Sequence, residues 1–259
     1  MISPQAIVEP GAKLGQNVEV YPFAYIQSGT EVGDNCIIYP QASILSGTKI
    51  GKNNRIFQNA VIGAMPQSMF NFKPGTPVRV TIGDNNIIRE NCVIAGGYET
   101  PEGTSLGNDN SLMDHAHLCH DVHIKNRCVI GINNILCSRV EVDSGTILSN
   151  SVVCLVDVRV GRYALVQSGC RMQKDVPPYI VLGGNPAAYK GVNATILKQT
   201  GTSDRILRHI GNAYRLVYMG NFSLEDAILQ IKDQVPQGEE IDYITSFIGN
   251  AKNGIVRQM

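Results

Sequence analysis

Residues 8–50, VEPGAKLGQNVEVYPFAYIQSGTEVGDNCIIYPQASILSGTKI, repeat a six-residue pattern. An aliphatic side chain recurs at every sixth position, and a mostly small residue precedes it by two positions. This period fits neither a helix, with about 3.6 residues per turn, nor a plain strand, which alternates every two residues. It is typical of a parallel β-helix, in which each six residues supply one short strand and one corner, and three strands close a triangular coil.

The same register continues far beyond this stretch and predicts a mainly β protein. The aliphatic positions are Val8, Leu14, Val20, Ile26, Val32, Ile38, Ile44, Ile50, Ile56, Ile62, Ile82, Ile88, Ile94, Leu106, Leu112, Leu118, Ile124, Ile130, Leu136, Val142, Leu148, Cys154, Val160 and Val166. The first small positions are Ala12, Val18, Ala24, Thr30, Cys36, Ala42, Thr48, Asn54 and Ala60. Taken in threes, the repeats predict about eight coils. We expect a left-handed parallel β-helix, by analogy with known hexapeptide helices rather than from sterics.

Two segments interrupt the repeat. They are residues 64–79, AMPQSMFNFKPGTPVR, and residues 95–105, AGGYETPEGTS. Loops that leave a rigid scaffold often carry binding residues, so both are candidates for a functional site. The alternative is that each is a tolerated insertion without a function.

The pattern fades after Val166, and the end of the chain has helical patterns. Ser203 and Ser223 are suitable N-caps for two helices, and Pro236 is expected to end the second of them before a third begins. We therefore predict a β-helix over residues 1–192 and a C-terminal helical domain over residues 193–259.

Composition narrows the class of protein. Hydrophobic residues make up 43% of the 259, enough for a core, and no apolar run is long enough for a membrane span. Lys plus Arg equals Asp plus Glu at 22 each, so nucleic acid is not an expected partner. Seven cysteines without a CxxC pair indicate reduced thiols. We expect a cytoplasmic protein with no integral membrane association.

The stretch MDHAHLCHDVHI, residues 113–124, contains four of the five histidines. In a hexapeptide coil His117 should point outward from a strand, His115 and His120 should lie at corners, and His123 should lie on the next strand. The chain turns too far between them for four imidazoles to meet at one metal, so we predict no metal site within one chain. A site shared between subunits stays open, and His115 and His123 are expected to be solvated.

His120 and Asp121 form the most reactive pair in this stretch. A neutral imidazole can take a proton from an alcohol, and an adjacent carboxylate can orient it or stabilise its charge. The pair by itself is weak evidence, because exposed His-Asp dipeptides are common at corners.

Several motifs resemble the acyl-carrier-protein-dependent UDP-N-acetylglucosamine O-acyltransferases of lipid A biosynthesis. They are the hexapeptide repeat, GNDNSLMDHAHLCHDVHIKNRC, DVPPY, GNPA, GVN and the helical tail. The resemblance covers essentially the whole chain. It implies transfer of a 3-hydroxyacyl group from acyl carrier protein to the 3-hydroxyl of UDP-N-acetylglucosamine, without a cofactor, by a homotrimer with sites between subunits.

Carried over by position, the resemblance implies that His120 is the general base and Asp121 its partner. The backbone amide of Ser138 would hold the oxyanion. The residues that would contact substrate are His117, Gln67, Arg139, Asn193 and Gln199.

Other positions depart from the family pattern. Arg139 replaces a histidine, LVDV at 155–158 replaces HQFC, and Gln199 and Thr200 replace two arginines. Losing such charge-assisted contacts weakens binding of a nucleotide sugar. The alternatives are therefore the same chemistry on a different acceptor, or a non-catalytic binding or assembly paralogue. A metal-dependent hydratase with interfacial histidines is disfavoured by the helical tail.

Overall fold

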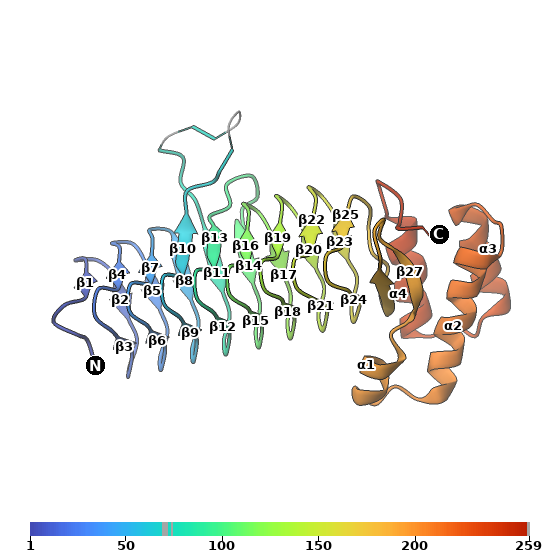
Figure 1. Ribbon diagram of the computed structural model, residues 1–259, viewed down its shortest axis with the longest axis horizontal. Helices are drawn as coiled ribbons and strands as arrows, with labels where there is room; N and C mark the ends of the chain where they lie inside the picture. The colour runs from blue at the N-terminus through green and yellow to red at the C-terminus, as the bar shows by residue number, and fades with distance from the viewer. Residues whose placement is uncertain (69–71, 74, 258–259) are drawn as a thin grey trace.

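The computed structural model describes residues 1–68, 72–73 and 75–257. Its strands form a three-sided parallel β-helix that ends in a group of helices (Figure 1). Away from the two loops, a residue pairs with the residue one full coil later, as Ile7 pairs with Tyr25. Each six-residue unit is therefore one side of the triangle, as predicted.

The strands described lie on three faces. Face 1 has nine: β1 (Ile7–Val8), β4 (Tyr25–Ile26), β7 (Ser43–Ile44), β10 (Val61–Ala64), β13 (Val93–Ala95), β16 (His117–Leu118), β19 (Ile135–Leu136), β22 (Val153–Cys154) and β25 (Arg171–Met172). Face 2 has eight: β2 (Lys13–Leu14), β5 (Glu31–Val32), β8 (Thr48–Ile50), β11 (Val80–Ile82), β14 (Thr104–Leu106), β17 (His123–Ile124), β20 (Glu141–Val142) and β23 (Arg159–Val160). Face 3 has ten: β3 (Glu19–Val20), β6 (Ile37–Ile38), β9 (Arg55–Ile56), β12 (Ile87–Ile88), β15 (Ser111–Leu112), β18 (Val129–Ile130), β21 (Ile147–Leu148), β24 (Leu165–Val166), β26 (Ile180–Gly183) and β27 (Ala188–Val192).

The core is a column of the predicted aliphatic and small residues. From Val18 onward almost every predicted inward residue is buried, whereas those of the first coil are only partly covered. The repeat also extends one unit further than predicted, because Cys170 and Met172 are buried at the small and aliphatic positions of β25. Stacking identical positions buries apolar surface that no single coil could cover alone.

Corner residues explain the frequent asparagines. Asn17, Asn35 and Asn53 have positive φ angles of 56–58°, a region that asparagine tolerates better than most residues. Their side-chain amides also donate to one another from coil to coil, as Asn17 does to Asn35 over 3.1 Å. The corners between faces 2 and 3 are therefore stabilised by an amide ladder.

Both loops leave the rod at the corners between faces 1 and 2, which we call the loop edge. The first loop joins β10 to β11 and the second joins β13 to β14, close to the predicted bounds of 64–79 and 95–105. Residues 69–71 and 74, within the first loop, lie outside the described residues. In Figure 1 both loops project from the same side of the rod.

The C-terminal end differs in part from the prediction. Helices α2 (Asp204–Met219), α3 (Leu224–Gln234) and α4 (Glu239–Gly249) were expected, and Ser203 and Ser223 cap the first two with their side chains. A short helix, α1 (Ala194–Gln199), and an antiparallel pairing of β26 with β27 were not. The helical pattern of α1 is too short to recognise from its period.

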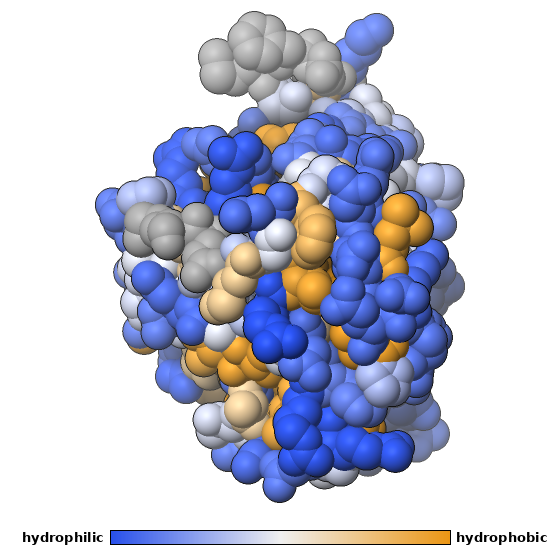
Figure 2. Space-filling model, turned by 90° about the vertical axis from the view of Figure 1, so that its right-hand side faces the viewer, coloured by the Kyte–Doolittle hydropathy of each residue, from blue (hydrophilic) through white to orange (hydrophobic). Residues whose placement is uncertain are grey.

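Side chains connect the helices to the rod. Tyr243 of α4 donates its hydroxyl to Asp143 at the end of β20, and Arg159 of β23 donates to the Phe247 carbonyl. The chain then returns to the rod, where Ile255 bridges Asp175. Figure 2, which views this end, shows mainly hydrophilic residues with smaller hydrophobic patches between them.

No helix among the described residues is both long and apolar enough to cross a membrane.

Candidate active site

His120 and Asp121 occupy the corner between β16 and β17, on the loop edge. Asp121 has a φ of 57°, so the chain turns sharply there. His120 Nδ1 lies 3.0 Å from Asp121 Oδ2. His120 keeps 7% of its surface exposed and Asp121 none. This corner therefore holds a buried imidazole–carboxylate pair, unlike the exposed pairs that are common at corners.

The second loop surrounds the Asp121 carboxylate with hydrogen-bond donors. The backbone amides of Tyr98, Glu99 and Thr100 donate to it over 3.0–3.2 Å, and so does the Thr100 hydroxyl over 3.0 Å. The Asp121 amide in turn donates to Thr104 Oγ1. A carboxylate removed from water needs such partners. The second loop is therefore part of the site.

These donors determine the ionisation of Asp121. Burial by itself would raise the pKa of Asp121, but hydrogen bonds from His120 and the three loop amides outweigh it and leave this pKa below its ordinary value. An ionised carboxylate only accepts hydrogen bonds, so His120 Nδ1 carries the proton. In the neutral imidazole this places the lone pair on His120 Nε2, where it can accept a proton from an alcohol.

Two aromatic rings pack near this imidazole. The Tyr98 ring centroid lies 4.8 Å from that of His120, with the planes inclined by 39°. Phe72 of the first loop contacts Tyr98 edge-on at 5.2 Å. The Tyr98 hydroxyl is buried and has no hydrogen-bond partner among the described residues. Residues of both loops thus restrict how the His120 ring can turn.

The Ser138 amide lies on the loop edge one coil beyond His120. At an earlier corner of this edge the corresponding amide, Ser28 N, donates to Glu9. In the described part of the chain, the Ser138 amide donates to no group. It is therefore free to bind an oxyanion, although that role stays a prediction.

His117 projects from β16 on face 1, beside Val93 of β13 and Ile135 of β19. Burial lowers its pKa, so the ring is neutral at pH 7. A neutral imidazole can both donate and accept hydrogen bonds. Its position on the strand that leads into the His120 corner agrees with a substrate contact, which stays a prediction.

Arg139 does not offer the free guanidinium that a substrate contact requires. Its Nε lies 2.6 Å from Asp157 Oδ1, its Nη2 3.1 Å from Asp157 Oδ2, and its Nη1 2.7 Å from Glu99 Oε2. The carboxylates of Asp157 and Glu99 therefore both pair with the Arg139 guanidinium, because the fold places a later corner and the second loop on either side of Arg139.

The other predicted substrate contacts are dispersed. Gln67 is exposed in the first loop. Asn193 is almost fully buried, and its side chain donates to the Tyr163 carbonyl over 2.9 Å, so within one chain it is a structural link. Gln199 is exposed at the end of α1, which Figure 1 places on the side of the rod away from the loops. Within one chain, Asn193 and Gln199 therefore lie away from His120.

The remaining histidines of the cluster differ from each other. His115 is exposed beside Asp114, as expected. His123 is less solvated than expected, because it is half-buried on β17 with Nδ1 2.8 Å from Ser105 Oγ. Strand pairing on face 2 places Ser105, His123 and Glu141 in one row.

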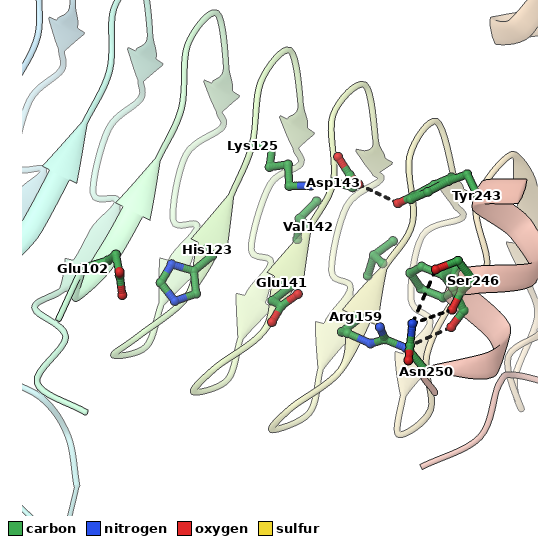
Figure 3. Close-up of a pocket in the computed structure, with 12 residues that line it drawn as sticks. Glu102, His123, Lys125, Glu141, Val142, Asp143, Arg159, Tyr243, Ser246 and Asn250 are labelled. Carbon is green, nitrogen blue, oxygen red and sulfur yellow. Dashed lines mark hydrogen bonds and ion pairs between the residues drawn. The ribbon is translucent and has the colours of Figure 1, made fainter. Parts of the chain in front are cut away.

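A groove runs along face 2 between the second loop and α4 (Figure 3). Two adjoining cavities of about 460 and 620 Å³ share His123, Glu141 and Arg159. The second is also lined by Thr100 and Arg139, so it reaches the loop edge near the His120 corner. These volumes are typical of sites for small molecules.

Sequence reasoning missed the groove and the loop contacts to Asp121. Part of the groove could have been predicted from the sequence, because outward residues of face 2 recur every eighteen positions, as His123, Glu141 and Arg159 do. The second loop was recognised, but nothing in its composition indicated that the amides of residues 98–100 face a carboxylate.

Glu99, His120 and Asp121 place possible ligand atoms within 4.8 Å of one another. Glu99 is paired with Arg139, and the Asp121 carboxylate already has five hydrogen-bonding partner groups. Binding a cation would require giving these up. The arrangement therefore favours orientation of the imidazole over metal coordination.

A triangular β-helix of hexapeptides with a buried His–Asp pair beside a groove defines a transferase of the hexapeptide class. A family model described as bacterial transferase hexapeptide (six repeats) matches residues 11–46 and 29–64. A second, described as Udp N-acetylglucosamine O-acyltransferase, domain 2, matches residues 175–256.

Relatives of known identity match the whole chain. The acyl-[acyl-carrier-protein]–UDP-N-acetylglucosamine O-acyltransferase of Pseudomonas entomophila (strain L48) is 39% identical over 257 residues, 99% of each chain. The UDP-N-acetylglucosamine acyltransferase structure from Bacteroides fragilis 9343 has 43% identity and a TM-score of 0.96, covering 99% of this chain and 100% of that one. The corresponding enzyme structure from Francisella novicida has 32% identity and a TM-score of 0.96, covering 100% and 94%. The chain belongs to the acyl-[acyl-carrier-protein]–UDP-N-acetylglucosamine O-acyltransferase family, and its fold is the left-handed parallel β-helix.

Proposed function

We propose that this protein transfers a 3-hydroxyacyl group from acyl carrier protein to the 3-hydroxyl of UDP-N-acetylglucosamine, the first step of lipid A biosynthesis. The full-length match to relatives with this activity supports the reaction. The single structural observation that carries it is the buried His120–Asp121 pair, whose geometry leaves His120 Nε2 as a base.

The chemistry follows from this geometry. His120 Nε2 takes the proton of the sugar hydroxyl while the hydroxyl oxygen attacks the thioester carbonyl carbon. The Ser138 amide donates to the oxyanion that forms. Collapse of this intermediate breaks the carbon–sulfur bond, and the leaving thiolate takes the proton back from His120. The products are an acyl ester of the sugar and the free thiol of the carrier protein.

We infer that the site is completed by neighbouring copies in a homotrimer. Asn193 and Gln199 lie away from His120 within one chain. A nucleotide sugar bound at His120 could therefore contact these two residues only if a second copy supplies them. A cytoplasmic location belongs to the same proposal, since all seven cysteines are free thiols, which a reducing compartment maintains. The division at residues 192 and 193 stays a proposal, with β27 ending at Val192 and α1 beginning at Ala194.

The test is an acyl-transfer assay with purified protein, acyl carrier protein charged with 3-hydroxyacyl chains, and UDP-N-acetylglucosamine. The wild type should form the O-acylated sugar nucleotide. His120→Ala should lower kcat by roughly 10²- to 10⁴-fold, the usual contribution of a positioned general base.

His115→Ala is the matched control, because His115 is exposed at another edge of the rod. It should react like the wild type. Acylation of a different sugar nucleotide by the wild type would correct the acceptor. Carrier-protein binding without turnover would contradict the proposed activity and favour a non-catalytic role.

A further inference from the structure

We propose that Arg139 is a positioning residue: through Glu99 it holds the second loop against Asp121 and so fixes the orientation of the His120 ring. The kinetic part of this inference rests on the proposed function. The structural part does not, because it concerns how the loop is held in the free protein.

The orientation of Asp121 depends on the tip of the second loop. Besides His120, every described group that donates to its carboxylate belongs to residues 98–100. If these amides moved away, the buried carboxylate would lose its partners and would no longer be held in one orientation. The loop tip therefore holds the Asp121 carboxylate in place and, through it, the His120 ring.

The loop has separate ties at its base and at its tip. At the base, Arg79 and Gly97 exchange backbone hydrogen bonds over 2.9 Å. At the tip, Glu99 projects forward along the loop edge and pairs with Arg139 at 2.7 Å. Tyr98 and the loop amides contact His120 and Asp121 one coil further on; in the described part of the chain, the Glu99–Arg139 pair is the ion pair that joins the tip to the coil after that.

Arg139 is itself held in place from two directions. Asp157, one coil further on, binds Nε and Nη2 of its guanidinium, a geometry that limits rotation. Its backbone amide donates to the His120 carbonyl over 3.2 Å. Asp157, Arg139 and Glu99 are thus linked in series along the loop edge, next to the His120 corner.

The same contacts argue against a direct substrate role. The two carboxylates accept hydrogen bonds from three of the five N–H donors of the guanidinium and more than neutralise its charge, so the group is a poor partner for a phosphate. The Arg139 and Asp157 side chains are 38% and 52% exposed. Ion pairs this exposed contribute little to global stability, so variants of them should fold.

The experiment compares Arg139→Gln, Glu99→Gln, the double variant and the control Arg127→Gln in the full-length protein. Arg127 is exposed at the corner between faces 2 and 3, away from the loop edge. Amide hydrogen exchange of residues 98–100 is measured by mass spectrometry, and kcat and KM for both substrates are measured in the acyl-transfer assay.

Each single variant should exchange these amides about tenfold faster and lower kcat about tenfold, with KM within about twofold, because a misplaced base slows the reaction without weakening binding. The double variant should match the single variants, since both break one contact. Arg127→Gln should behave as the wild type.

Three results would overturn the proposal. Unchanged exchange in both single variants would mean that the ion pair does not hold the loop. A raised KM for the sugar nucleotide with unchanged kcat would make Arg139 a substrate contact. Additive effects in the double variant would mean that the two side chains act separately. If the wild type shows no transfer, the proposed function fails while the exchange measurement still tests the loop contact.

Discussion

The proposed role of His120 as a base rests on what surrounds it. Its Nδ1 proton is directed at an ionised Asp121, which leaves Nε2 free, and the Tyr98 ring packs against the imidazole. The two residues are adjacent in sequence, yet their state depends on donors more than twenty positions away, at residues 98–100. The proposed general base is thus built from a corner and a loop together.

Replacing Asp121 tests the charge of this pair. Because the pKa of Asp121 is lowered in the folded protein, its stabilising effect is present above its unfolded value of about 3.9 and is lost as the pH falls through the folded value. Asp121→Asn should therefore cost roughly 1–3 kcal/mol of stability at pH 7, and the difference from wild type should shrink as the pH falls through the lowered folded pKa of Asp121. Thermal unfolding of both proteins across this pH range measures the effect.

The control is Asp109→Asn, at an exposed corner between faces 2 and 3 where Asp109 accepts a hydrogen bond from Asn85 that an asparagine can also accept. Its melting temperature should follow the wild type at every pH. Equal stability of Asp121→Asn and the wild type at pH 7 would contradict an ionised, stabilising Asp121.

Elements of this protein differ in what defines their ends. Helix α3 begins at a side-chain cap, since Ser223 Oγ accepts from the Asp226 amide, whereas α4 begins at Gly238 without a side-chain cap. A capped helix end satisfies amides that otherwise depend on water. The β-strands of the rod need no such signal, because a neighbouring coil supplies each partner.

We expect opposite effects from changing these two caps. Ser223→Ala should lower the free energy of unfolding of the helical end by about 1 kcal/mol. Gly238→Ser should raise this free energy by about 0.3 kcal/mol. A Cβ at residue 238 would meet only Glu240 Oε2, at 3.9 Å, so the serine fits. Thermal denaturation compares both with the wild type, and a stabilised Ser223→Ala would show that the cap has no role.

At the scale of the whole molecule, the rod exposes apolar side chains close to the site. Ile135 on face 1 is 43% exposed, and Val156 on the loop edge is 45% exposed. A rod with one hydrophobic column inside has no further core to place them in. Their exposure on the face and the edge next to His120 supports the proposed assembly, in which copies meet at the site.

The assembly gives a direct prediction. Native mass spectrometry should find a particle of three times the 28.1-kDa chain. Ile135→Lys should weaken it, because a charge would have to be buried between copies. Leu229→Lys, at an exposed position of α3, is the control and should leave the mass unchanged. A monomeric wild type that still transfers acyl groups would contradict the shared site.

The sequence alone determined the triangular coil, because units of one strand and one corner fit a six-residue period, and this period runs from Val8 to Val166 apart from the two loops. It also determined the helix caps at Ser203 and Ser223, which are local signals. Only the tertiary structure decided the surroundings of Asp121 and the pairing of Arg139, because both depend on loop residues that a coil brings close from a distance along the chain. Local pattern specifies a backbone path, whereas burial and charge pairing exist only after separate segments have met.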